Sequence, residues 1–283
     1  MLAWILQRFA GIFLFVLSLA VQAQPATDAT RPLTLAVVPQ YTSVQIHKDW
    51  TPFIERVSRD SGVALTLKIY QSIPKFEADL VKGVPDFAFM NPYHEVMARR
   101  AAGYLPLVRD NTPLTGVLLV RRDSPVRTVK DLAGSKLAFP APNAFGASLY
   151  MRALLTEQEG VKIEPVYVKT HSNVFRQVIV GQTVAGGTVN SALQREPGTV
   201  IEQLRVIFET PATAAHPLAA HPRIPEAQRK AVTQAILKLR DDPTAAPLLQ
   251  AVQMATPVAA DYARDYRPLE RLKLEKYLVT EPD

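Results

Sequence analysis

The chain has 283 residues, 48% of them hydrophobic, a formal net charge of +6 and no cysteine. Without cysteine, disulfides, thiolate metal sites and papain-type or thioredoxin-type thiol chemistry are excluded. No run of five or six consecutive basic residues marks a nucleic-acid patch, so we expect no nucleic-acid partner. The mild basic excess favours a small acidic ligand.

The N-terminal segment, 1–23, has the pattern of an export signal. Arg8 precedes an apolar run from Ile12 to Val21, and the small-x-small sequence ending at Ala23 is a cleavage pattern. The run of roughly 10 residues is well short of the ~20 that a membrane-spanning helix needs. We therefore predict a cleaved signal peptide, a mature chain from about Gln24 and a periplasmic location. An uncleaved membrane anchor is the alternative.

The first part of the mature chain alternates strands and helices. In chain order we predict a strand at 33–38, a helix at 51–62, a strand at 64–70, a helix around 76–80, a strand at 86–90 and a helix at 91–103. Thr51 and Pro52 supply a cap and a first-turn proline, and Asn91 and Pro92 do the same for the later helix. Gly62 and Gly103 stand where the two helices should stop.

The alternation of strands and helices then repeats. We predict strands at 117–121, 136–139, 165–169, near 184 and at 205–208, with helices at 128–134, 144–157 and 172–180 between them. A proline-rich stretch, 210–225, leads into a helix at 225–240 with a buried stripe of Val232, Ala235, Ile236 and Leu239. Strands alternating with helices predict an α/β fold with mostly parallel sheets, and two such segments in tandem predict two lobes.

Candidate binding residues lie where strands end and helices begin, because ligands of open α/β sheets gather at the carboxyl ends of the strands. In the first lobe these are Tyr41, Asn91, Tyr93 and His94, and in the second lobe Asn143, Ala144, Phe145, Gly146, Ala147, Ser148, His171 and Asn190. The start of a helix at 144 offers free N–H groups and a dipole that favours an anion. The alternatives are structural roles: an ordinary Asn cap at Asn91, a satisfied buried histidine at His171, and a simple turn before Asn190.

Enzyme signatures are missing from the sequence. There is no G-x-S-x-G elbow, no H-E-x-x-H, no P-loop and no close carboxylate pair in a defined setting. His216 and His221 lie five apart in the proline-rich stretch, but no third ligand at a recognisable spacing accompanies them. We expect no metal and no cofactor. A clamp-fold enzyme with His94 or His171 as acid–base is the remaining enzymatic alternative.

With these residues in view, the chain resembles the phosphate/phosphite/phosphonate-binding family of ABC-transporter periplasmic proteins over nearly all of its mature length. The resemblance rests on Trp50-Thr51-Pro52-Phe53, Asp86-Phe87-Ala88, Val120-Arg121-Arg122-Asp123-Ser124-Pro125, Asp131-Leu132, the segment 139–148, His171 and Gly181. It implies a type II periplasmic-binding-protein clamp with lobe 1 at 32–116, lobe 2 at 117–210 and a return to lobe 1 with C-terminal helices at 211–283. It also implies that the ligand sits between the lobes and that they close around it by a hinge.

The sequence departs from the family at the ligand site. The phosphonate binders present a Ser-Thr-Ser-Gly run where this chain has Ala144, Phe145, Gly146 and Ala147, and their aromatic hydroxyls fall near Ile73 and Leu114. His171 is retained. Phe145 adds apolar surface, so we expect a ligand that pairs an acidic group with an apolar or aromatic body, unless Phe145 turns into the core.

These observations predict a monomeric solute-binding protein that captures a small anionic or zwitterionic ligand, phosphonate-like or phosphate-like by family, for an ABC permease. A sensory protein that presents its ligand state to a membrane histidine kinase or another receptor is the alternative.

Overall fold

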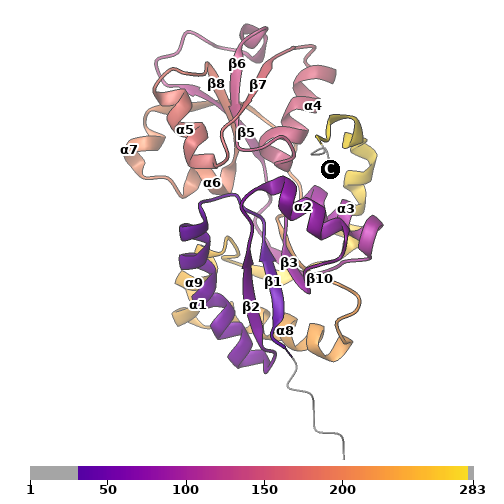
Figure 1. Ribbon diagram of the computed structural model, residues 1–283. Helices are drawn as coiled ribbons and strands as arrows, with labels where there is room; N and C mark the ends of the chain where they lie inside the picture. The colour runs from indigo at the N-terminus through magenta and orange to yellow at the C-terminus, as the bar shows by residue number, and fades with distance from the viewer. Residues whose placement is uncertain (1–30, 280–283) are drawn as a thin grey trace, which may run out of the picture. The chain divides into compact units, whose positions relative to one another are not determined.

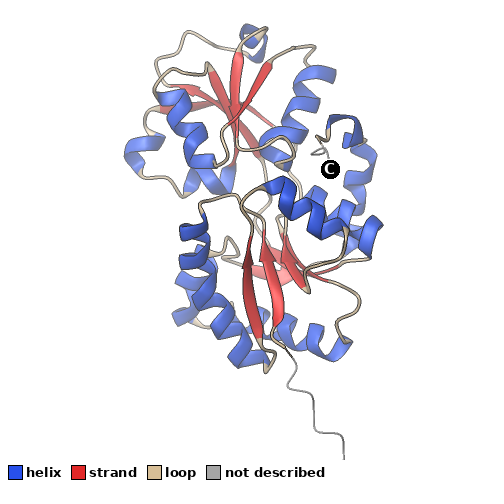
Figure 2. Ribbon diagram, in the orientation of Figure 1, coloured by secondary structure: helices blue, strands red, loops and turns tan. Residues whose placement is uncertain are grey.

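The computed structural model describes residues 31–279, so the predicted signal segment lies outside the described residues. Within them, the strands form two sheets with helices on both faces of each (Figures 1 and 2). The predicted α/β class is confirmed. None of the helices in this part of the chain is long and apolar enough to cross a membrane.

The first sheet has the strand order β11-β4-β10-β3-β1-β2, and we call its elements lobe 1. Its strands are β1 (Leu33–Val37), β2 (Leu65–Ile69), β3 (Phe87–Phe89), β4 (Leu105–Asp110), β10 (Pro217–Ala220) and β11 (Pro257–Ala259). Its helices are α1 (Ser43–Ser61), α2 (Ile73–Val81), α3 (Pro92–Ala102), α8 (Glu226–Leu239), α9 (Ala246–Ala251) and α10 (Tyr262–Asp265), with the short turns η3 (Pro243–Ala245), η4 (Arg267–Leu272) and η5 (Leu274–Tyr277).

The second sheet has the order β7-β6-β8-β5-β9, and its elements form lobe 2. Its strands are β5 (Gly116–Arg121), β6 (Lys136–Phe139), β7 (Glu164–Tyr167), β8 (Ala185–Val189) and β9 (Leu204–Glu209). Its helices are η1 (Val129–Leu132), η2 (Phe145–Leu149), α4 (Tyr150–Glu157), α5 (His171–Ile179), α6 (Asn190–Gln194) and α7 (Gly198–Ile201).

Both sheets are mixed rather than mostly parallel. β1 runs parallel to β2 and β3, but β10 is antiparallel to β3 and β4, and in lobe 2 β5 is antiparallel to β8 and β9. The reason is the route of the chain between the lobes. β10 begins beside the carboxyl end of β3, where the Met90 N–H donates to the Pro217 carbonyl over 3.1 Å. A strand that enters at that end must run in the opposite direction.

Two predicted helices match the structure closely, and one predicted start was wrong. α3 lies between its Asn91 cap and Gly103, and the buried residues of α8 are the four predicted. Helix α1, however, begins at Ser43, where the Thr42 hydroxyl accepts from the Gln45 N–H, and Pro52 lies inside it. The buried face of α1 extends before the proline, so packing outweighs the backbone hydrogen bond that Pro52 cannot donate.

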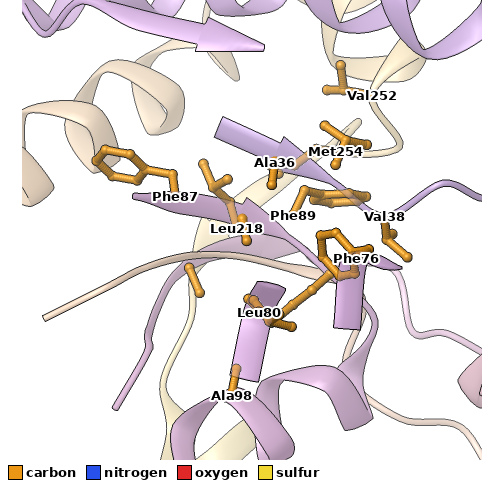
Figure 3. Close-up of a cluster of buried hydrophobic side chains, with 14 of the residues drawn as sticks. Ala36, Val38, Phe76, Leu80, Phe87, Phe89, Ala98, Leu218, Val252 and Met254 are labelled. Atoms are coloured by element: carbon orange, nitrogen blue, oxygen red, sulfur yellow. The ribbon is translucent and has the colours of Figure 1, made fainter. Parts of the chain in front are cut away.

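The core of lobe 1 gathers side chains from both faces of its sheet (Figure 3). Phe76 and Leu80 of α2 lie on one side of the strands, and Val252 and Met254, which follow α9, lie on the other. Phe76 is fully buried. A buried side chain of this size stabilises the fold by about 1.5–3 kcal/mol.

Two segments, 111–115 and 210–213, connect the lobes. Leu114 and Thr213 exchange backbone hydrogen bonds of 2.9 Å in both directions, and the Thr210 hydroxyl accepts from the Gly116 N–H over 2.9 Å. Asn190 holds the first segment, since its side chain accepts from the Thr115 N–H and donates to the Pro113 carbonyl. The connection between the lobes is therefore a short antiparallel pair of segments.

Candidate functional site

A helical segment of lobe 2, 145–157, begins directly against the backbone of two strands. A Cβ on Gly116 would lie 2.1 Å from the Gly146 carbonyl oxygen, and a Cβ on Gly187 would lie 2.2 Å from that of Ala147. Only glycine permits these approaches. The first turn is π-helical, and the N–H groups of Phe145, Gly146 and Ala147 have no acceptor within the helix.

A small cavity, which we call cavity A, lies at this helix start and receives side chains from both lobes. Its lining consists of Val38, Gln40, Ile73, Asn91 and His216 from lobe 1, and Pro140, Ala144, Phe145, Gly146, Ala147, His171 and Val189 from lobe 2. Its volume is about 20 Å³, room for about one water molecule. No charged side chain lines it, so its polar groups are neutral dipoles.

His171 is a neutral imidazole at one wall of cavity A. Its side chain is buried, its Nδ1 lies 2.7 Å from the Thr188 hydroxyl, and burial lowers its pKa to about 4. In the tautomer in which Thr188 donates to Nδ1, the Nε2–H is left to donate to a ligand. The predicted residue therefore lies beside the predicted helix start, held in place by a threonine that the sequence did not single out.

His216 and Gln40 line cavity A from lobe 1, and sequence analysis did not assign either to a ligand. His216 stacks on Phe89 with ring centroids 5.5 Å apart, and burial lowers its pKa to about 3, aided by repulsion from His94 and His171. Gln40 is buried, with no side-chain hydrogen bond to another described residue. Gln40 follows the strand-end rule, because it comes after β1. His216 does not, because it precedes β10, which is antiparallel to β3 and so begins beside the carboxyl end of β3.

The same strand explains why His216 and His221 do not form a metal pair. They lie at opposite ends of β10, and the Nδ1 of His221 accepts from the Arg223 N–H over 3.1 Å. Among residues 31–279 no cluster of His, Cys, Asp or Glu is suited to a metal ion.

Three other predicted residues hydrogen-bond to one another across the lobes. His94 Nε2 lies 2.7 Å from Glu77 Oε1, Asn143 Nδ2 donates to Glu77 Oε2 over 2.9 Å, and Asn91 Nδ2 donates to the Asn143 carbonyl over 3.2 Å. Asn143 also exchanges two hydrogen bonds with the backbone of Val279. This Glu77–His94–Asn143 network ties lobe 1, lobe 2 and the C-terminal segment together.

An aromatic stack crosses the lobes beside this network. The Phe145 ring lies 6.2 Å from Tyr93 of lobe 1 and 5.5 Å from Tyr150 of lobe 2, nearly parallel to both. Phe145 is 2% exposed. Its ring faces are thus occupied by two tyrosines, which leaves little of its surface for the aromatic ligand body that the sequence led us to expect.

The remaining predicted residues take supporting positions. The Tyr41 ring lies 4.8 Å beneath the Arg195 guanidinium, and burial raises the pKa of its hydroxyl to about 12. Ser148 accepts from the Arg152 guanidinium over 3.2 Å. Asn190 holds the connection between the lobes, as described above. Its two side-chain hydrogen bonds turn its amide toward the backbone of the crossing segment.

Comparison with known proteins identifies the family. The family model described as "ABC transporter, phosphonate, periplasmic substrate-binding protein" matches residues 35–266. The chain belongs to this family. Its members are substrate-binding components of transporters, and the family match agrees with the resemblance found in the sequence.

A curated relative and two solved structures extend the comparison. The "Phosphate-import protein PhnD" of Mycolicibacterium smegmatis is 27% identical to this chain over 180 residues. The match covers 61% of this chain and only 54% of the length of that relative. A binding protein component of an ABC phosphonate transporter from Pseudomonas aeruginosa superposes with a TM-score of 0.76 at 14% identity, over 85% of each chain. PhnD1 from Prochlorococcus marinus, in complex with methylphosphonate, gives 0.76 at 16% identity, over 86% of this chain and 98% of its own. These structural likenesses confirm the two-lobed binding-protein fold.

Proposed function

We propose that this protein captures a small anionic or zwitterionic ligand in the periplasm and delivers it to an ABC permease. The observation that carries the proposal is the convergence of neutral hydrogen-bond donors from both lobes on cavity A. The N–H groups of the 145–147 turn and His171 come from lobe 2, and His216 and Gln40 come from lobe 1. A ligand that touches both sets holds the lobes together.

Neutral donors suit the capture and release of an anion. A hydrogen bond to a charged group contributes about 1.5–3 kcal/mol, and the helix start adds a favourable dipole. Since no arginine or lysine lines cavity A, no ion pair opposes the release of the anion. A permease has to distinguish full from empty protein, so the ligand must favour the closed arrangement of the lobes.

The direct test is a thermal-shift screen of small carboxylates, phosphonates and phosphate esters, followed by calorimetric titration of each compound that stabilises the protein. Ligand at 100 times its Kd should stabilise by about 2.7 kcal/mol. His171→Ala should raise the Kd at least tenfold, a loss of about 1.4 kcal/mol. His47→Ala is the matched control, because His47 is exposed on α1.

Two results would overturn the proposal: no anion in the panel binds, or His171→Ala binds as tightly as the wild type. Within the panel, we expect methylphosphonate, phosphite and phosphate themselves to bind weakly. Ala144, Phe145 and Gly146 offer no side-chain hydroxyl to these anions. Micromolar binding of any of the three would contradict this expectation.

We also propose that segment 1–23 is removed during export. N-terminal sequencing of the periplasmic protein should begin near Gln24. A membrane-bound protein that still carries Met1 would contradict it.

A further inference from the structure

Arg195 of lobe 2 reaches lobe 1 at the edge of a second and larger cavity, which we call cavity B. Arg195 follows helix α6 and lines this cavity, whose volume is about 330 Å³. His216 lines both cavity B and cavity A. Because the space of cavity B separates the lobes, they can meet there only through side chains at its edge.

The hydrogen bonds of the Arg195 side chain all go to lobe 1. Its Nη2 donates to Asp49 Oδ2 over 2.8 Å, and its Nη1 donates to the Ala251 carbonyl over 2.8 Å. The guanidinium carbon also lies 4.8 Å from the centroid of the Tyr41 ring. Within residues 31–279 this side chain has no hydrogen bond or ion pair with lobe 2. Arg195 therefore has these partners only when the lobes are together.

The partners in lobe 1 come from separate elements and suit a guanidinium. Asp49 is on α1, where its other oxygen accepts from Gln45 Nε2 over 2.7 Å. Ala251 is the last residue of α9, so its carbonyl lies at the negative end of the helix. Tyr41 supplies the face of an aromatic ring. The planar fork of an arginine can donate to two acceptors and lie over a ring at once, which a lysine cannot do.

The degree of burial makes this contact stronger than an ordinary surface ion pair. A pair of fully exposed charges contributes little to stability. Here the Asp49 side chain is 10% exposed and that of Arg195 is 28% exposed. Both groups regain water when the lobes part, which limits the net gain from the contact. The contact therefore favours the closed arrangement and still allows the lobes to open.

The position of Arg195 links the contact to the hinge and to cavity A. Asn190 begins α6 and holds the connecting segment 111–115, and Arg195 follows the other end of this five-residue helix. A rotation at the connecting segment therefore moves Arg195 relative to lobe 1. The Tyr41 ring lies 6.1 Å from the ring of His171, which lines cavity A. The contact thus lies beside the predicted ligand contact.

We infer that Arg195 is a latch that holds the lobes closed through Asp49, the Ala251 carbonyl and the Tyr41 ring. The inference goes beyond the proposed function, because it makes closure depend on the chain itself as well as on the ligand. The protein without ligand then already populates the closed arrangement. A bound ligand increases that population further.

The test measures the distance between the lobes without any ligand. Since the chain has no cysteine, Glu55→Cys on α1 and Arg176→Cys on α5, both at exposed positions, give two unique sites for nitroxide labels. Double electron–electron resonance on the purified and dialysed protein reports the open and closed populations. Arg195→Ala should raise the ratio of open to closed protein about tenfold. Asp49→Ala should do the same, and the double variant should open no further, because both changes remove one contact.

Arg122→Ala is the matched control, because Arg122 donates to the carbonyls of Glu202 and Leu204 inside lobe 2. It should give the wild-type distribution of distances. The latch is overturned if Arg195→Ala also gives the wild-type distribution, or if Arg122→Ala opens the lobes equally. It is overturned as well if the effects of Arg195→Ala and Asp49→Ala add in the double variant. Because no ligand enters the experiment, each of these results leaves the proposed anion capture standing.

Discussion

Replacing Gly187 by alanine tests whether backbone packing positions the helix start that lines cavity A. Gly187 lies in β8, and a Cβ there would lie 2.2 Å from the Ala147 carbonyl oxygen and 2.5 Å from Phe139 Cε1. Phe139 is fully buried, and the oxygen belongs to the backbone of the 145–149 turn. Neither neighbour can rotate away, so the turn must move off the sheet.

The expected cost follows from the contacts. Overpacking in a filled core costs about 1–3 kcal/mol, and each 1 kcal/mol lowers the Tm of a domain of this size by about 2–4 °C. Gly187→Ala should therefore melt about 2–12 °C below the wild type. Because the displaced turn carries Gly146 and Ala147, which line cavity A, ligand affinity should fall with it.

Gly198→Ala is the matched control, since no atom lies within 4 Å of a Cβ at Gly198. This change should leave the Tm unchanged or raise it slightly, because alanine restricts the unfolded chain. Differential scanning calorimetry at pH 7 compares the three proteins. If Gly187→Ala melts within about 1 °C of the control, the turn does not depend on its close approach to β8, and the reasoning fails.

Three further predictions concern titration and closure. Burial holds the pKa of His171 at about 4 and that of His216 at about 3, below the ordinary value, so the unfolded chain binds more protons and stability should fall as the pH drops from 7 toward 4. In urea unfolding, the free energy of unfolding at pH 5 should be lower than at pH 7 by about 2 kcal/mol for each histidine. If the stability of His216→Gln falls as steeply with pH as that of the wild type, the prediction for His216 is contradicted. Glu95 is fully buried with both carboxylate oxygens unpartnered among the described residues, and burial raises its pKa to about 8. Between pH 4.5 and 8 the folded state therefore binds one proton more than the unfolded state, and the free energy of unfolding falls as the pH rises through this range. The free energy of unfolding of Glu95→Gln should exceed that of the wild type by a few kcal/mol at pH 8 but not at pH 4.5. A difference that stays constant with pH would refute the assignment. Asn143→Ala removes the hydrogen bonds to Glu77 and Val279 that join the lobes. The unliganded variant should therefore show a larger radius of gyration than the wild type by small-angle scattering. An unchanged radius would show that the network does not hold the lobes together.

Much of the local structure was predictable because it depends on neighbouring residues. The Asn91 cap and Gly103 stop bracket α3, and the 3.6-residue period of Val232, Ala235, Ile236 and Leu239 identified the buried face of α8. The start of α1 was misplaced because Thr51-Pro52 is a strong local signal. Tertiary packing of the preceding turns outweighed it.

The site was predictable in part. Strand ends pointed to the 143–148 segment and to His171, and the structure brings Ala144 to Ala147 and His171 together in cavity A. Their role in ligand binding stays a prediction. His216 was missed because β10 is short and begins with a proline, which made its surroundings resemble a loop.

What the sequence by itself determined is the α/β class, the family, and the neutral chemistry of a helix start without side-chain hydroxyls. These follow from periodicity and residue type, which are properties of short stretches of chain. Only the tertiary structure decided that Phe145 lies between two tyrosines, that Asn143 meets Glu77, and that His216 stands between two cavities of very different size. Each of these facts depends on residues far apart in the chain, whose meeting is set by the two crossings between the lobes and by the packing that follows from them.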